Sequence, residues 1–222
     1  MRIVPLIIIV FSLLLAGCQG GKEQLKKAVV PFDVQIISYH VREIEKSLEE
    51  FIRRLYLKNP KYEKDPEVRH KKIQAIFHGA EMPVTEFNDK PSHEVLAAAF
   101  EPNPTYSDRI FLLGLGMKKS VREAYSIEEK IFVTSLQIGH GRLESLYANT
   151  SQVNWRLKVY RDEDGRLLFL TNEVGENGYI NMGYEVIMTE ILTRIKDDIY
   201  LRGGAPPKFA FSMASLFMAI LF

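Results

Sequence analysis

The most reactive side chain of the sequence is a single cysteine near its start. Cys18 is the only cysteine among 222 residues, and it directly follows Leu15-Ala16-Gly17. Ahead of it lie one cation, Arg2, and a mostly apolar stretch from Ile3 to Leu14. A lone thiol can form neither an internal disulfide nor a cysteine-rich metal site. The chemistry open to Cys18 is therefore modification of its sulfur.

A charged start, an apolar middle and small residues before a cysteine resemble a bacterial lipoprotein signal peptide with its lipobox. The resemblance implies cleavage after Gly17, diacylglycerol on the Cys18 sulfur, and a further acyl chain, such as palmitate, on the new amino terminus. Two or more acyl chains hold a protein stably at a membrane. Gln19 follows the cysteine where an aspartate could stand, which in this class favours the outer membrane and a periplasm-facing domain. An uncleaved transmembrane helix is the alternative, but about 15 apolar residues fall short of the ~20 required.

The five histidines show no spacing typical of metal or catalytic sites. None belongs to an HExxH motif. His140 and Glu144 lie four residues apart, but two ligands without a third favour a polar surface pair over a metal site. The sequence also lacks the GxSxG and SxxK motifs of serine nucleophiles. We therefore predict no catalytic residue, no cofactor and no metal. The histidines are His40, His70, His78, His93 and His140.

Paired carboxylates are a second route to chemistry, because any two of the 28 acidic residues could meet in a cleft. Two inward carboxylates about 5 to 9.5 Å apart would indicate a hydrolase. Four acids lie near a predicted loop between helices, where we expect them to be solvated. An envelope hydrolase with a carboxylate-based site is therefore kept as an alternative. The four acids are Glu81, Glu86, Glu94 and Glu101.

A polar and aromatic cluster is the candidate binding surface. Tyr147, Asn154 and Trp155 are of the residue types that line binding grooves. A tryptophan packed in the helical core explains the same residues, and the sequence alone favours that core position.

A basic stretch runs from Arg53 to Lys72, with eight cations against three anions. Such a patch could contact anionic lipid head groups or cell-wall polymer. A solvated helix face is the commoner explanation. The mature chain balances 28 Lys and Arg against 28 Asp and Glu, which argues against nucleic acid as a partner. The eight cations are Arg53, Arg54, Lys58, Lys61, Lys64, Arg69, Lys71 and Lys72.

The elements that position these residues are predicted to be mostly helices. A first long helix is expected from Gln35 to Lys58, because apolar residues recur there every three or four positions. Asp65, Pro66 and Gly79 are the cap signals of a second helix. The apolar stripe of the first helix comprises Val41, Ile44, Leu48, Phe51, Ile52 and Leu55.

Serines suggest the starts of two further helices. Ser92 is expected to cap a short helix that ends at Phe100. Ser126 and Glu129 have the spacing of a capping box, which predicts another helix start.

Two apolar segments predict buried helices. The run Ile110–Met117 contains Gly114 and Gly116, which would let a neighbouring backbone approach closely. A last amphipathic helix is expected over Asn181–Arg202, with its apolar side turned inward.

Residues 155–170 permit two interpretations. A helical spacing from Leu143 continues to Tyr160, which favours helix there, followed by a turn and a short extended segment. Alternation through Trp155, Leu157 and Val159, with Asp164-Gly165 as a turn, is typical of a β-hairpin. We favour the helix.

The carboxyl-terminal segment Phe209–Phe222 contains no charged residue. Its 14 residues are too few to cross a bilayer. We expect a helix buried in the domain core, with docking on the membrane interface or a partner as the alternative.

These patterns predict a mainly α fold: one domain of about six or seven amphipathic helices, with a short β-hairpin near 155–170 as the open alternative. The expected organisation is a signal peptide (1–17), a lipidated tether (18–31) and a helical domain (32–222). Hydrophobic residues make up 46% of the sequence, enough for a core.

Short stretches of the second half carry a resemblance to a family. Asp108-Arg109-Ile110-Phe111, Leu146-Tyr147 and Trp155-Arg156-Leu157 resemble uncharacterised proteobacterial lipoproteins over residues 105–222. The resemblance implies a mainly helical envelope protein and transfers no catalytic residue. We therefore expect a non-enzymatic lipoprotein that binds or organises an envelope protein, peptidoglycan or lipid. A hydrolase, or a carrier of a lipid or small apolar ligand, is the alternative.

Overall fold

The computed structural model describes residues 32–126, 138–174, 178 and 180–203. This part of the chain is mainly helical, which confirms the predicted fold class. It contains α3 (Phe32–Lys58), α4 (Pro66–His78), α5 (Ser92–Phe100), α6 (Arg109–Tyr125), α7 (His140–Val159) and α8 (Gly183–Gly203). A minimal antiparallel pair, β1 (Glu173–Val174) and β2 (Ile180–Asn181), precedes α8. The predicted signal peptide, the tether with Cys18, and Phe209–Phe222 lie outside the described residues.

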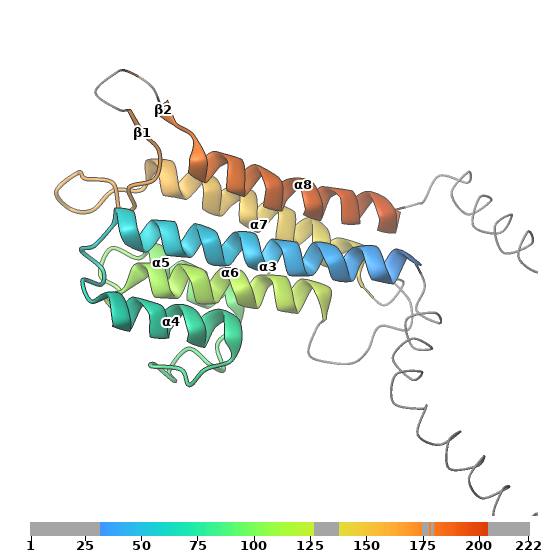
Figure 1. Ribbon diagram of the computed structural model, residues 1–222, viewed down its shortest axis with the longest axis horizontal. Coiled ribbons are helices and arrows are strands. Elements are labelled where there is room, and N and C mark those ends of the chain that lie inside the picture. The colour runs from blue at the N-terminus through green and yellow to red at the C-terminus, as the bar shows by residue number, and fades with distance from the viewer. Residues whose placement is uncertain (1–31, 127–137, 175–177, 179, 204–222) are drawn as a thin grey trace, which may run out of the picture.

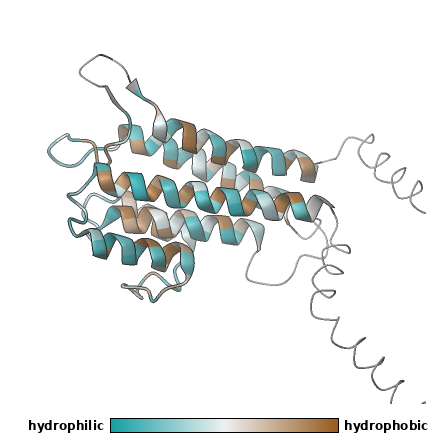
Figure 2. Cartoon of the chain, viewed as in Figure 1, coloured by the Kyte–Doolittle hydropathy of each residue, from teal (hydrophilic) through white to brown (hydrophobic). Residues whose placement is uncertain are grey.

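The long helix α3 is the centre of the bundle. Figure 1 shows α7 and α8 on one side of α3 and α4, α5 and α6 on the other, and α3 contacts α4, α6 and α8. Its predicted apolar stripe is confirmed, since Ile44, Phe51 and Leu55 are fully buried. Figure 2 shows hydrophilic and hydrophobic residues alternating around the helices, as expected of amphipathic elements. No helix in the described ranges is both long and apolar enough to cross a membrane.

The apolar helix α6 is buried along most of its length, as predicted. A Cβ added at Gly116 would lie 2.7 Å from the Leu96 side chain and 3.0 Å from the Leu96 backbone nitrogen. The glycine thus allows the close contact between α5 and α6. At Gly114 an added Cβ would meet Ile52 of α3 at 3.1 Å. Both glycines have the packing role that the sequence predicts.

The caps of α4 are confirmed. The Asp65 carboxylate accepts from the backbone nitrogen of Glu67 at 2.8 Å, and Gly79 ends the helix at a φ of 72°. A left-handed residue of this kind is favourable only without a Cβ.

The predicted cap at Ser92 is wrong. Ser92 is the first residue of α5 and caps nothing; its backbone nitrogen donates to Glu123 on α6 at 2.8 Å, so a distant carboxylate does the capping. Ser126 ends α6 in a left-handed conformation, at a φ of 53°, and the helix predicted after it lies outside the described residues. Glu129 lies outside the described residues.

The helical interpretation of residues 155–160 is confirmed, because α7 continues to Val159. Beyond it, the chain turns at Gly165 and forms one bridge between Arg161 and Leu167. Leu157 is buried, whereas Trp155 is 56% exposed. The alternation that resembled a strand therefore follows from one helix with an inner and an outer face.

Candidate binding face

The candidate metal and acid residues of the sequence lie on the surface. Nε2 of His140 lies 3.2 Å from the Glu144 carboxylate on the exposed side of α7. In the part of the chain that the structure describes, no three His, Cys, Asp or Glu side chains gather as metal ligands would. The four acids considered for a cleft are all exposed, and Glu86 pairs with Lys90 at 3.4 Å.

The predicted aromatic cluster divides between core and surface. Tyr147 packs partly buried against the core, and the Asn154 amide donates to Glu185 at 3.3 Å. Trp155 contacts the Tyr160 ring edge-on, with 6.1 Å between ring centroids, and most of its surface is exposed. The core position favoured for Trp155 is therefore wrong. The three residues lie on α7, where Tyr147 and Trp155 differ widely in exposure.

One buried charged cluster ties α3, α4 and α6 together. Asp108 caps α6 and accepts from the Tyr56 hydroxyl at 2.9 Å and from Lys72 at 2.7 Å. Lys72 also donates to Glu63 at 2.8 Å. Burial lowers the pKa of Lys72, but these two carboxylates outweigh it and hold that pKa above its usual range. Burial and then the Asp108 charge raise the pKa of Tyr56. Lys72 therefore stays charged and Tyr56 keeps its proton, so both can donate to Asp108.

A second buried cluster ties α3, α6 and α8 at the opposite end of the bundle. Asp198 is fully buried and accepts from the Tyr125 hydroxyl at 2.6 Å; its other oxygen lies 2.6 Å from Nδ1 of His40. Burial raises the pKa of Asp198, although both hydrogen bonds and the His40 charge oppose the shift. The Asp198 carboxyl group therefore links three helices and has a structural role.

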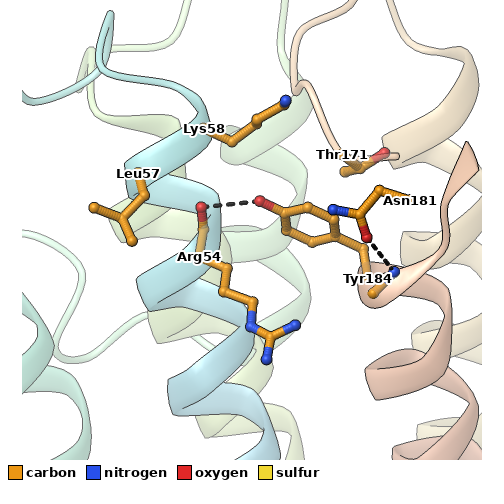
Figure 3. Close-up of a pocket in the computed structure, with 7 residues that line it drawn as sticks. Arg54, Leu57, Lys58, Thr171, Asn181 and Tyr184 are labelled. Atoms are coloured by element: carbon orange, nitrogen blue, oxygen red, sulfur yellow. Dashed lines mark hydrogen bonds between the residues drawn. The ribbon is translucent and has the colours of Figure 1, made fainter. Parts of the chain in front are cut away.

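A groove lies between the end of α3 and the start of α8, and we call it the first groove. It has a volume of about 270 Å³. Figure 3 shows the Tyr184 ring lying between the two helices, with its hydroxyl donating to the Arg54 carbonyl at 2.9 Å. Arg54 and Lys58 are its basic side chains, and Arg54 pairs with Glu50; among the described residues no carboxylate lines the groove. The Asn181 side chain accepts from the Gly183 backbone nitrogen at 3.0 Å, at the positive end of α8.

A second groove lies on the other side of α3, against α4, with a volume of about 340 Å³. Its basic side chains are Arg53, Arg69 and His70, and Glu49 is its carboxylate. Glu49 lies 3.0 Å from Nε2 of His78.

The two grooves share Leu57, whose side chain is 60% exposed. The exposed Leu57 side chain thus forms an apolar ridge between the two grooves, each of which has basic side chains in its lining. We call the ridge and both grooves the Leu57 face.

Only some side chains of the predicted basic stretch, Arg53 to Lys72, form an exposed basic surface. Lys72 is buried in the Asp108 cluster, and Arg53 and Arg54 both pair with Glu50, at 2.7 and 2.5 Å. Lys61 donates to the Leu167 carbonyl at 3.4 Å. The Leu57 face is therefore set by a few side chains of α3, α4 and the segment before α8.

The Leu57 face lies far from the start of α3. At about 1.5 Å per residue, the 27 residues of α3 span about 40 Å. Because α8 begins at the first groove and runs back along α3, Gly203 lies at the same end of the bundle as Phe32, as Figure 1 shows. The start of α3 and the end of α8 therefore both lie at the end of the bundle opposite the Leu57 face.

Comparison of the chain with protein-family models, with curated proteins and with solved structures found no match.

Proposed function

We propose that this protein is a lipoprotein anchored to the outer membrane through lipid on Cys18. Its helical domain faces the periplasm and binds an anionic envelope component on the Leu57 face, without catalysis. The observation that carries the proposal is the place of that face, about 40 Å along α3 from the residue that follows the tether.

The charge of the Leu57 face supports an anionic partner. Lys58 and the start of α8 carry positive charge in the first groove, and Arg69 carries it in the second. Arginine side chains bind carboxylates through two parallel hydrogen bonds. The peptide carboxylates of peptidoglycan and an acidic protein surface both offer such groups.

The exposed Leu57 supplies the apolar part of the interaction. Covering a leucine that is 60% exposed contributes about 1 to 2 kcal/mol. A central apolar contact ringed by charged groups is the usual arrangement of a binding hot spot.

The distance from the tether argues against the anchoring membrane as the partner. The tether would join the domain at Phe32, so the Leu57 face lies at the far end of α3 from the attachment point. Salt screens charges beyond a Debye length of about 8 Å, so a Leu57 face held about the length of α3 from the lipid head groups would be attracted only weakly.

Photocrosslinking in intact envelopes tests the proposal. A benzophenone side chain at Leu57 is expected to capture peptidoglycan fragments or one acidic protein, which mass spectrometry distinguishes. Tyr200 on α8 is 67% exposed and lies at the tether end, so it is the matched control position. Equal capture at both positions would contradict the proposal.

A charge-reversal pair adds a second test on purified sacculi and on the captured protein. Lys58→Glu with Arg69→Glu is expected to weaken binding at least about tenfold, because each lost charged contact is worth ~1.5 kcal/mol or more. The control reverses Arg42 and Lys46, two exposed cations in the tether half of α3. Equal loss in both double variants would indicate a general effect of net charge.

A further inference from the structure

A third groove lies on the side of the bundle, between α4, α6 and the loop after Gly79, with a volume of about 270 Å³. Its floor is apolar. Ile76 of α4 and Leu115 of α6 are 5% and 4% exposed, and Phe77 and Met82 pack half-buried beside them.

One end of this groove is basic. Lys118, Lys119 and Arg122 of α6 line it, and no carboxylate of the described residues does. The Lys118 charge is matched by an ion pair with Glu45. The groove thus combines an apolar floor with a cationic end.

Lys119 is held in place without being neutralised. Its ammonium donates to the backbone carbonyls of Phe87 at 3.0 Å and Asn88 at 2.7 Å, which carry no net charge. An ammonium has three donors, so one remains for a further acceptor. Arg122, three residues on along α6, lines the groove on the same side of the helix.

We infer that this groove binds the carboxylate end of a single-chain fatty acid. The carboxylate accepts from Lys119 beside Arg122, and the first carbons of the chain lie on Ile76 and Leu115. A volume of about 270 Å³ is just below the ~300 Å³ of the smallest usual ligand sites, so the groove takes the head and part of the chain. This site is separate from the Leu57 face and does not depend on it.

The test uses the full-length chain in nanodiscs of phosphatidylcholine, with a diazirine-bearing palmitic acid as the probe and the corresponding alcohol as its uncharged match. The acid is expected to label peptides that contain Ile76–Met82 and Leu115, and the alcohol about tenfold less, since a charge-assisted hydrogen bond distinguishes the two. Equal labelling by acid and alcohol, or labelling confined to other peptides, would overturn the inference. This comparison needs no variant, so it is decisive even if a substitution impairs folding.

Variants then locate the head group. Lys119→Met is expected to reduce labelling by the acid about tenfold, and Lys119→Arg to restore it. Lys46→Met, which removes an exposed cation of α3, should leave labelling unchanged. Labelling of the Lys119→Met protein at the original level would overturn the assignment of the carboxylate to Lys119.

Discussion

Asp198 is expected to be among the most sensitive positions of the fold. Asp198→Ala removes the carboxylate that accepts two hydrogen bonds, so the Tyr125 hydroxyl and the His40 ring lose their partner. Loss of one partner from a buried ionic pair costs about 3 to 5 kcal/mol. That is a large share of a typical stability of ~5 to 15 kcal/mol. For a chain of this size, the melting temperature should fall by roughly 6 to 20 °C.

The adjacent Asp197 is the matched control. It lies on the same turn of α8 but is exposed, so Asp197→Ala should change stability by no more than about 0.5 kcal/mol. Urea unfolding followed by circular dichroism gives both values under one condition. A loss below about 1 kcal/mol for Asp198→Ala, or an equal loss for the control, would refute the role of the buried cluster.

The pH dependence of the same position has a definite sign. Burial raises the folded-state pKa of Asp198 above the ordinary 3.8. The folded state therefore binds the proton more tightly than the unfolded state, and protonation stabilises the fold. Relative to Asp198→Asn, the wild-type protein should gain stability as the pH falls through the raised pKa toward 3.8. A stability difference that is constant across this range, or that changes in the opposite direction, would contradict the shift.

Three further predictions concern packing and the ends of the chain. Gly116→Ala should destabilise the fold by about 1 to 3 kcal/mol, because the added Cβ meets Leu96. Gly141→Ala is the control and should not destabilise the fold in this way, because the space around Gly141 is open. Thermal melting of the two variants tests the difference. Cys18→Ser should abolish labelling by a fatty-acid analogue, and label that persists would contradict lipidation there. Deleting Phe209–Phe222 should unfold the domain if the segment is buried, since each large buried side chain contributes ~1.5 to 3 kcal/mol; cooperative melting near the full-length temperature would contradict burial.

The helices could be predicted from the sequence because their signals are local. Asp65, Pro66 and Gly79 each act within one turn of α4, and the apolar stripe of α3 repeats along one element. The cap at Ser92 was mispredicted because the group that satisfies the start of α5 is distant in sequence. Glu123 reaches Ser92 from α6, and no spacing within α5 indicates it.

The buried charges show the same limit. In the sequence, Lys72 belongs to a basic run and Asp198 to a pair of aspartates, and each looks solvated. Their burial depends on helices that meet only after folding, since Lys72 joins Asp108 from another helix and Asp198 joins His40 across 158 positions. Side-chain type predicts exposure well only where no distant partner compensates the charge.

The Leu57 face follows from the same long-range packing. Leu57 lies beside the buried Leu55 and Tyr56, so periodicity alone treats it as one more apolar residue of α3. It is exposed because α4 and α8 cover the two flanks of α3 and leave the ridge between them open, with basic residues on either side. Because the other faces of α3 pack against the core, the helix is held rigidly and Leu57 has a fixed place near its end. A rigid helix of about 40 Å keeps that end apart from Phe32, so the same element that builds the core also fixes the distance between the Leu57 face and the start of α3.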